Sequence, residues 1–401
     1  MRPASHDVTP QRDRSRPARS DHLALVVKRR SGDTWAVIAG GGTAGHVVPA
    51  IAIGQALVAR GHAPDSIHFV GSSRGMERHL VPAAGFTVTL LPGRGLARRP
   101  TLANVGAVAG LAAAAVMAVV LMGRRRPAVV VAVGGYASAA CVAAAVLWRV
   151  PLVVAEQNAV PGLANRVAAR VARASAVSFP GTPLPRAQVT GNPVRREMLG
   201  VDRRPEGRAV ARAQLNVDPD AMLVVVAGGS LGARRINDAV IGLAADWARR
   251  PGWAVRHVVG ERDWEELSEA APPSVPGGLR YEQVRYEDRM DRVYAAADIA
   301  VHRAGASTVA ELAVAGVPAI LVPLPGAPGD HQTANAQRLA AVGAAVVVSD
   351  AELDAPRLEA ELDRLAAEPD TRAAMAVAAA GLARPAAADD VAGLAERFAR
   401  G

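Results

Sequence analysis

The stretch AVIAGGGTAGHVVPAIAIGQAL, residues 36–57, decides the fold of this chain. Its first residues predict a buried strand, which ends at a glycine loop and is followed at once by a helix. Gly40, Gly42 and Gly45 have the G-x-G-x-x-G spacing, in which backbone N–H groups and a helix N-terminus can approach a phosphate or a sugar. The stretch therefore predicts the first unit of an α/β domain with a ligand-binding loop.

A nicotinamide cofactor does not fit this loop. A dinucleotide-binding domain carries an acidic residue at the end of its second strand. Here the second expected strand begins at Ser66 and ends in Gly71 and Ser72, and Asp65 precedes it. We therefore expect no dinucleotide cofactor.

The pattern starts again at MLVVVAGGSLGARRINDAV, residues 222–240. Continuous apolar strands between alanine-rich helices are typical of parallel sheets that are covered on both faces. Two such series predict the α/β class with two doubly wound, Rossmann-like domains. The expected strands are 34–40, 66–71, 86–91, 128–135, 152–157 and 176–179 in the first series, and 222–230, 254–260, 279–284, 299–305, 318–324 and 344–350 in the second.

The domain boundaries follow from the loops between these series. The proline-rich stretch 180–186 and the sequence GNPVRR at 191–196 separate the two sets of strands. We expect a disordered basic extension over 1–33, one domain over 34–190, a second over 191–370, and a helical segment over 371–401 that packs back on the first domain. That last helix should be broken near Pro385.

Composition narrows the class of protein. The net charge is +9 and the chain has one cysteine, Cys141, so a disulfide framework and a multi-cysteine metal site are excluded. A basic chain suggests nucleic acid, but arginine carries nearly all of the charge and aromatic residues are only 3%, so we expect no nucleic-acid partner. The arginines of 1–33 could instead touch anionic phospholipid.

Residues 102–123 carry no charge and are long enough for a transmembrane helix. Alanine and glycine dominate the segment, and arginines flank both of its ends, which gives no orientation bias. We therefore expect a helix buried within the α/β fold. A helix with one face on a membrane surface is the functional alternative.

Two other motifs would predict different kinds of site. Gly228 to Gly232 also spell G-x-S-x-G, the nucleophile elbow of α/β hydrolases, with Ser230 as nucleophile and Asp298 with His302 or His331 as partners. Asp218-Pro219-Asp220 has the D-x-D form of metal-dependent transferases, but its proline and its position before a strand indicate a turn. We expect no metal site.

Several motifs in order resemble one known family. They are GGGTAGHVVPA at 40–50, GGYAS at 134–138, AEQNAVPGLANR at 155–166, GNPVR at 191–195, GGSLGARRIN at 228–237 and HRAGASTVAELAVAGVPAILVPLP at 302–325. The chain resembles, over about 35 to 370, the MurG-type N-acetylglucosaminyltransferases of peptidoglycan synthesis. The resemblance implies the GT-B architecture with a cleft between its domains. It also implies inverting transfer of N-acetylglucosamine from UDP-GlcNAc to the 4-hydroxyl of the muramoyl sugar of lipid I, which is carried on undecaprenyl diphosphate.

The resemblance assigns roles to particular residues. Arg195 and Ser230 would hold the diphosphate, and Glu311 would accept hydrogen bonds from the ribose hydroxyls. Gln332 and Asn158 would contact the donor sugar. Ala306, Ser307 and Thr308 would line the helix start beside the donor.

The acceptor side needs a base near the attacking hydroxyl. His46 is the first candidate and Glu156 the competing one, while Thr43, Ala44 and Gly45 would cradle the ligand. The chain departs from the family at His331, which stands beside Gln332 where two glutamines are common. It departs also at Glu287, where an apolar residue is common, and at Ala155, where a histidine is usual.

The same resemblance implies partners and a location. The first domain would face the acceptor and the membrane, and the second would bind the donor. We expect a peripheral protein on the cytoplasmic side of the cell membrane, docked on anionic phospholipid through 102–122 with Arg94, Arg98 and Arg99. Cell-wall synthesis and division proteins are expected partners. The alternatives are another GT-B glycosyltransferase, acting on a glycolipid or natural product, and a nucleotide-sugar binding protein without turnover.

Overall fold

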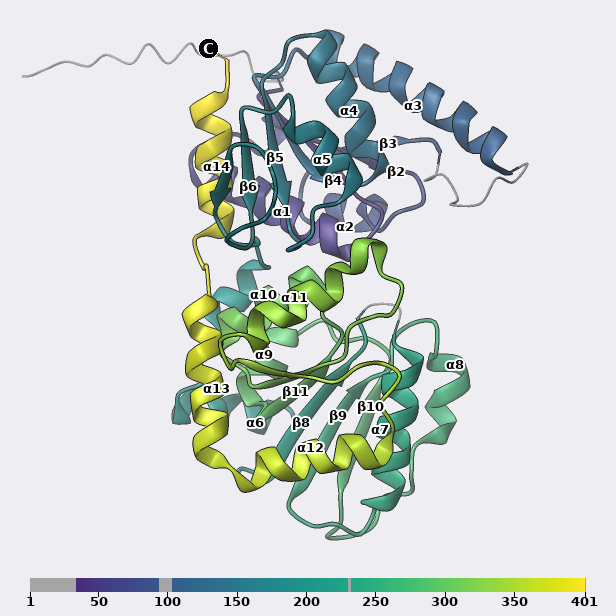
Figure 1. Cartoon of the computed structure of the whole chain (residues 1–401), viewed down its shortest axis with the longest axis vertical. Helices are drawn as coiled ribbons and strands as arrows, with labels where there is room; N and C mark the ends of the chain where they lie inside the picture. Colours follow the sequence, from purple (N-terminus) through teal and green to yellow (C-terminus); the bar gives the residue numbers. More distant parts are fainter. Residues whose placement is uncertain (1–33, 94–102, 230–231, 401) are drawn as a thin grey trace, which may run out of the picture. The chain divides into compact units, whose positions relative to one another are not determined.

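The computed structural model describes residues 34–93, 103–229 and 232–400, and the side chains of 103–108 are not included (Figure 1). The predictions for 1–33, for Arg94, Arg98 and Arg99, and for Ser230 therefore lie outside the described residues.

The first half is built on a parallel sheet in the order β3-β2-β1-β4-β5-β6-β7. Its central strand, VVVAVG, is buried along its whole length, as expected for a parallel sheet covered on both faces. Its strands are β1 (Ala36–Gly40), β2 (Ile67–Ser72), β3 (Thr87–Leu91), β4 (Val129–Gly134), β5 (Leu152–Glu156), β6 (Ala174–Val177) and β7 (Ala187–Val189). Its helices are α1 (Ala44–Ala59), η1 (Pro64–Ser66), α2 (Glu77–Ala83), α3 (Ala103–Arg125), α4 (Tyr136–Leu147) and α5 (Leu163–Ala169).

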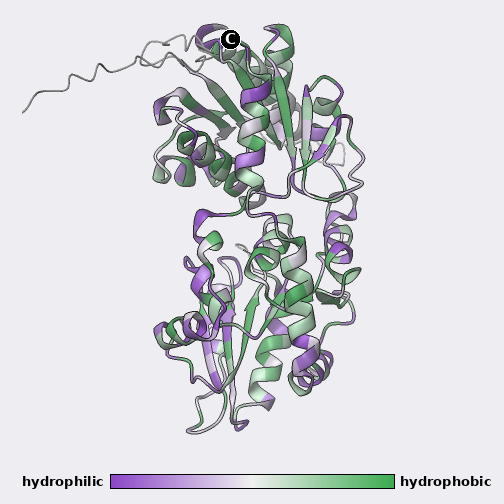
Figure 2. Cartoon of the chain, turned by 90° about the vertical axis from the view of Figure 1, so that its left-hand side faces the viewer, coloured by the Kyte–Doolittle hydropathy of each residue, from purple (hydrophilic) through white to green (hydrophobic). Residues whose placement is uncertain are grey.

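The second half repeats this plan with a parallel sheet in the order β10-β9-β8-β11-β12-β13. Its strands are β8 (Met222–Ala227), β9 (Trp253–Val258), β10 (Arg280–Val284), β11 (Ile299–His302), β12 (Ala319–Leu321) and β13 (Ala345–Val347). Its helices are η2 (Arg196–Gly200), α6 (Pro205–Gln214), α7 (Arg234–Asp246), α8 (Trp264–Leu267), η3 (Ser268–Ala270), α9 (Met290–Ala296), α10 (Ala306–Ala315), η4 (Pro328–Asp330), α11 (His331–Ala340), α12 (Ala355–Ala367) and α13 (Pro369–Leu382). In Figure 2 the central strands of the sheets are mostly green, in keeping with their burial.

The last helix, α14 (Ala387–Phe398), returns to the first half, where Figure 1 shows it in yellow. Val391 and Ala395 belong to the same buried cluster as Ile38 of β1. Arg60, just after α1, forms ion pairs with Asp389 at 2.8 Å and Glu396 at 2.7 Å. The side chains of α14 thus cover one face of the first sheet, whereas α13 packs against α10 and α12 of the second half.

The α/β class with two doubly wound halves is confirmed. One strand was missed: β7 is three residues long and exposed, and it follows the proline-rich stretch, so it gave no apolar run to detect. The helical break near Pro385 is present, because α13 ends at Leu382 and α14 begins at Ala387.

Residues 103–123 of the uncharged segment form most of α3, and from residue 109 onward this helix is buried on one face only. Ala114, Ala118 and Met122 are fully buried, whereas the side chain of Val116 is 64% exposed. Among the helices that the structure describes, none combines the length and hydropathy that crossing a bilayer requires.

Candidate functional site

The first glycine loop is fixed by a buried carboxylate. Both oxygens of Glu77, at the start of α2, accept hydrogen bonds from the N–H of Gly42, at 3.2 and 3.0 Å. Glu77 also accepts from the N–H of Ser72 at the end of β2. A Cβ on Gly41 would lie 2.2 Å from a Glu77 oxygen, so only glycine fits there. The loop that leads into α1 is therefore tied to the end of β2.

His46 lies in the first turn of α1, immediately after this loop. Its Nδ1 lies 3.2 Å from the hydroxyl oxygen of Thr43, the residue that precedes α1. Burial lowers the pKa of His46, while the negative charges of Glu156 and Glu77 raise it and His331 lowers it further. Ala44 and Gly45 form the helix start between Thr43 and His46. The structure thus brings His46, Glu156 and His331 into one electrostatic environment.

Glu156, at the end of β5, is buried and fully occupied by hydrogen bonds. One carboxylate oxygen accepts from the backbone N–H of Asn158 at 2.9 Å and from its side-chain amide at 3.2 Å. The other oxygen accepts from the N–H of Gly162 at 3.0 Å and from the amide of Asn165 at 2.9 Å. Glu156 therefore organises the loop that follows β5.

Asn158 lies where this loop meets the second half. Its Oδ1 accepts a hydrogen bond from the amide of Asn335, in α11, at 3.1 Å. Asn335 is fully buried; its Oδ1 accepts from the N–H of Ala159 at 2.9 Å, and its amide also donates to the carbonyl of Ala304 at 3.1 Å. Sequence reasoning missed Asn335, because an asparagine within a helix carries no spacing signal.

Arg195 and Glu311 form an ion pair with two contacts. Nε of Arg195 donates to one Glu311 oxygen at 3.1 Å, and Nη2 donates to the other at 3.3 Å. Burial raises the pKa of Glu311 and the Arg195 charge opposes this rise, while the carboxylate in turn keeps the pKa of Arg195 high against its own burial. The two residues were predicted separately, as a diphosphate contact and a ribose contact, and the structure places them together.

This ion pair lies in a pocket with a cavity volume of about 140 Å³, which we call the Arg195 pocket. Ala44 and Val48 of α1 line it from the first half. From the second half it is lined by Arg195, Ala227, Gly229, Val258, Tyr286, Glu287, Met290, Tyr294, His302, Ser307, Thr308 and Glu311. The pocket therefore joins the start of α1 to the start of α10.

The start of α10 offers polar groups to the Arg195 pocket. Ser307 and Thr308 line it, and the buried Ser307 hydroxyl has no hydrogen-bond partner within the described part of the chain. Ala306 is buried in the first turn and contributes its backbone. A helix N-terminus with an unpaired hydroxyl suits an anionic, hydroxylated ligand.

Gln332 and His331 open α11 and are only partly buried. Gln332 Oε1 accepts a hydrogen bond from the N–H of Leu324 at 3.0 Å, and Nδ1 of His331 donates to the carbonyl of Pro328 at 2.8 Å. Neither residue lines the Arg195 pocket. Glu287, which departs from the family pattern, does line the pocket and is paired with Arg256 at 2.6 Å.

The geometry does not support the hydrolase site or the D-x-D metal site. Asp298, the acid of the hydrolase hypothesis, pairs with Arg208 at 2.7 Å and Arg212 at 2.6 Å, and so is held away from a histidine. Asp218 accepts a hydrogen bond from the N–H of Asp220 at 2.9 Å, as in a turn. His302, buried beside the Tyr294 hydroxyl at 3.4 Å, was missed as a pocket residue.

Comparison with known proteins places these features in a family. Residues 36–177 match the glycosyltransferase family 28 N-terminal domain, and residues 223–391 match the corresponding C-terminal domain. The chain is 42% identical over 347 residues to the UDP-N-acetylglucosamine–N-acetylmuramyl-(pentapeptide) pyrophosphoryl-undecaprenol N-acetylglucosamine transferase of Nocardioides sp., covering 86% of this chain and 93% of that protein. It is 39% identical to the protein of the same name from Streptomyces coelicolor, covering 89% of this chain and 96% of that protein.

A solved structure agrees with these relatives. The crystal structure of Acinetobacter baumannii MurG superposes with a TM-score of 0.70 at 27% sequence identity, over 91% of this chain and 99% of that one. The chain therefore belongs to glycosyltransferase family 28, among the UDP-N-acetylglucosamine–N-acetylmuramyl-(pentapeptide) pyrophosphoryl-undecaprenol N-acetylglucosamine transferases.

Proposed function

We propose that this chain transfers N-acetylglucosamine from UDP-GlcNAc to N-acetylmuramyl-(pentapeptide) pyrophosphoryl-undecaprenol, as the names of its relatives state for them. One observation carries the proposal: the Arg195 pocket joins the start of α1, which bears His46, to the Arg195–Glu311 pair and the start of α10. Ala44 and Val48 of α1 line this pocket, and His46 lies between them in the helix without lining it, so the proposed base would act from beside the pocket that holds the anion-binding site. Residues 34–190 would serve the acceptor and residues 191–370 the donor.

The donor side suits a departing nucleoside diphosphate. When the bond between the sugar's anomeric carbon and the diphosphate oxygen breaks, negative charge grows on UDP. Arg195, the N-termini of α10 and α7 and the glycine loop with Ser230 would stabilise that charge without a proton transfer. Glu311 would accept hydrogen bonds from the ribose hydroxyls. Arg195 would then donate both to the Glu311 carboxylate and to the diphosphate.

The acceptor side needs one proton acceptor, and His46 fits that role. With Nδ1–H donating to Thr43, the lone pair on Nε2 can take the proton of the attacking 4-hydroxyl as the new carbon–oxygen bond forms. UDP leaves from the opposite face of the sugar, which gives inversion. The lowered pKa keeps His46 neutral near pH 7, and Glu156 and Glu77 stabilise the imidazolium once it forms.

Glu156 is less suited to be the base. Four N–H groups donate to its two oxygens, so taking a proton would require hydrogen bonds to the β5 loop to break. Its role in this proposal is to hold Asn158 and to support the charge on His46.

Sugar recognition is assigned to Asn158 and Gln332, whose amides both donate and accept hydrogen bonds. The test is transfer with three donors: UDP-GlcNAc, UDP-glucose and UDP-N-acetylgalactosamine. Product from UDP-GlcNAc at a kcat/KM at least about 100-fold above the other two supports the proposal. Equal use of all three would overturn the donor assignment and favour another GT-B glycosyltransferase.

We further propose peripheral docking on the cytoplasmic membrane surface through an α3–α4 patch. It comprises Val116, Met117 and Val120 of α3 with Val146, Leu147 and Trp148 at the end of α4, all at least 40% exposed. The Trp148 indole donates to the carbonyl of Val119 at 2.9 Å, which joins the two helices into one surface. Arg124, Arg126 and Arg149 are exposed beside it. An apolar patch with neighbouring arginines suits an anionic lipid surface.

Vesicle sedimentation tests the α3–α4 patch. Leu147→Glu should reduce binding to phosphatidylglycerol vesicles about tenfold or more, while Val377→Glu, at a 74% exposed position on α13, should not. Equal binding by both variants would overturn the docking assignment. The association with cell-wall synthesis and division proteins stays a prediction from the resemblance.

A further inference from the structure

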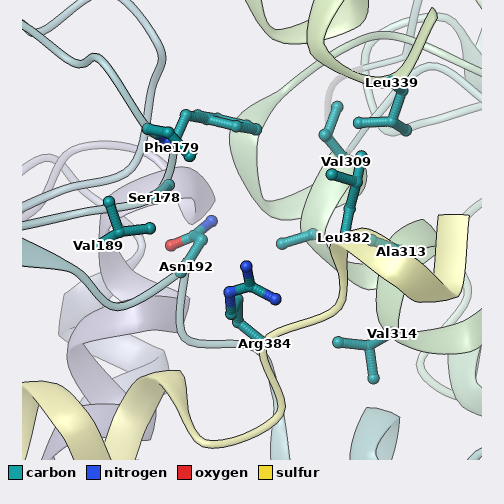
Figure 3. Close-up of a pocket in the computed structure, with 13 residues that line it drawn as sticks. Ser178, Phe179, Val189, Asn192, Val309, Ala313, Val314, Leu339, Leu382 and Arg384 are labelled. Carbon is teal, nitrogen blue, oxygen red and sulfur yellow. The ribbon is translucent and has the colours of Figure 1, made fainter. Parts of the chain in front are cut away.

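A second pocket, here the Asn192 pocket, lies on the other face of α10. Phe179 contributes from the first half, Asn192 from the segment that joins the halves, and Val309 and Ala313 from α10. Leu382, at the end of α13, and Arg384, in the segment before α14, complete its walls (Figure 3). Its cavity volume is about 80 Å³, so it would take a small ligand that also reaches its open side.

The Asn192 pocket is separate from the Arg195 pocket but shares two walls with it. Ser307, Thr308 and Glu311 of α10 face the Arg195 pocket, whereas Val309 and Ala313 face this one. Asn192 likewise lines the Asn192 pocket, whereas Arg195, three residues later in the chain, lines the Arg195 pocket. Variants must therefore be checked for donor binding.

Asn192 is a buried polar side chain with no hydrogen-bond partner among the residues that the structure describes. Its exposed fraction is 6%, and neither its amide nitrogen nor its carbonyl oxygen has a hydrogen-bond partner. A buried amide left unpaired is costly, and most such groups in proteins are satisfied. Asn192 therefore offers one donor group and one acceptor group to a ligand.

Arg384 supplies positive charge at the same side of the pocket. Gly191 approaches it so closely that a Cβ there would lie 2.3 Å from Arg384 Cβ, which puts Arg384 next to the Asn192 segment. Its side chain donates to the carbonyl of Ala383 at 3.1 Å, and among the described residues it forms no ion pair. The guanidinium is thus available to a carboxylate.

We propose that the Asn192 pocket binds a small N-acylated amino acid with an apolar side chain. Its carboxylate would accept from Arg384 and from the Asn192 amide, and its neutral N–H would donate to the Asn192 oxygen. Its side chain would contact Phe179, Val309 and Leu382. A free amino acid fits less well, because its ammonium group would lie near Arg384. This site is independent of the proposed transfer reaction.

Equilibrium dialysis of the full chain against labelled N-acetyl-leucine tests the proposal. We expect saturable binding of one molecule per chain with a dissociation constant on the order of 1 mM, since a ligand this small has few contacts. N-acetyl-leucinamide, which lacks the negative charge, should bind at least about tenfold more weakly. Saturating UDP should not displace the label.

Two variants and a matched control locate the site. Arg384→Gln should weaken binding at least about tenfold, and Val314→Trp, which fills the partly exposed wall of the pocket, should abolish it. Arg397→Gln, at an exposed arginine over the Phe398 ring, should leave it unchanged. UDP-GlcNAc binding by each variant verifies that it is folded.

Several outcomes would overturn the proposal. The first is the absence of saturation up to about 20 mM N-acetyl-leucine, which is roughly 20 times the expected dissociation constant. The others are equal affinity for the uncharged N-acetyl-leucinamide and full displacement of the label by UDP. Retention of binding by both Arg384→Gln and Val314→Trp, with UDP-GlcNAc still bound, would do the same.

Discussion

Arg195 and Glu311 form an ion pair with two similar contacts, at 3.1 and 3.3 Å, but the two side chains differ in burial, so Glu311 needs its partner more than Arg195 does. The Glu311 side chain is 8% exposed, whereas the Arg195 side chain is 30% exposed. Without its partner, the carboxylate would be left buried and unpaired, while the guanidinium could turn toward water. A buried charge without its partner is strongly destabilising.

We therefore predict that Arg195→Met lowers the free energy of unfolding by about 3 kcal/mol and Glu311→Gln by about 1 kcal/mol. Urea denaturation at pH 7.5 measures both. The Arg195 charge lowers the pKa of Glu311, so Arg195→Met should raise that pKa further, and the deficit relative to wild type should shrink as pH falls and folded Glu311 of the variant binds a proton. A larger loss for Glu311→Gln would contradict this interpretation.

The pKa of His46 sets the pH dependence of transfer. Burial lowers this pKa from 6.5, and the base must be neutral, so kcat/KM should be full above pH 6.5 and fall as pH drops through the lowered value. His46→Ala should lose at least about 100-fold in kcat, with partial rescue by added imidazole. A wild-type profile that falls already above pH 7, or an unimpaired His46→Ala, is incompatible with His46 as the base.

Glu77 positions the first glycine loop and touches no expected substrate atom. Its oxygens accept from Gly42 and Ser72, and the amide nitrogen of a glutamine could not accept these bonds. We predict that Glu77→Gln lowers kcat about tenfold or more, while UDP-GlcNAc binding in the second half changes less than about twofold. Glu352→Gln, at an exposed position, is the control. An equal loss of donor affinity would instead indicate general unfolding.

Asn335 makes three hydrogen bonds, of which those to Ala159 and Asn158 link the two halves and that to Ala304 lies within the second half. Asn335→Ala would leave buried polar groups unpaired, so we predict a loss of about 2–4 kcal/mol in unfolding free energy and a weaker affinity for UDP-GlcNAc. Gln337→Ala, at an exposed site on the same helix, should be nearly neutral. Similar results for the two variants would show that the cross-half bonds contribute little.

Buried neutral histidines predict how stability depends on pH. Burial lowers the pKa of His68, His257 and His302 to about 4 each, below the value of about 6.5 in an unfolded chain. The unfolded state therefore binds more protons as pH falls, so stability should be highest above pH 6.5 and decline toward pH 4. Urea midpoints at pH 7.5, 6 and 5 measure this, and His68→Gln should reduce the slope. A midpoint that rises toward pH 5 would refute it.

The strands of both sheets, apart from β7, could be predicted from the sequence. Buried parallel strands are mostly continuous apolar runs, so a few neighbouring residues are enough to identify each of them. The sequence also singled out both glycine-loop motifs, and Arg195 and Glu311, as candidates for the site. It did not show that these two residues pair across 116 positions, or that Asn335 meets Asn158. Such contacts depend on how α10 and α11 meet the first half, and no periodicity records that.

The exposed face of α3 could not be predicted from the sequence either. The uncharged segment predicted the helix, but its exposed face became visible only when Ala114 and Ala118 were found buried and Val116 exposed. The contribution of Leu147 and Trp148 depends on α4 packing beside α3, which a linear pattern does not encode.

The most direct test of the central claim is the product formed on the acceptor. Purified chain, labelled UDP-GlcNAc and N-acetylmuramyl-(pentapeptide) pyrophosphoryl-lipid with a shortened polyprenyl chain would be mixed with a chelator, and the lipid product analysed by mass spectrometry. We predict one added N-acetylglucosamine on the 4-hydroxyl of the muramyl sugar, at a rate unchanged by the chelator. Release of free N-acetylglucosamine without a disaccharide, or no product while UDP-GlcNAc still binds, would contradict the account.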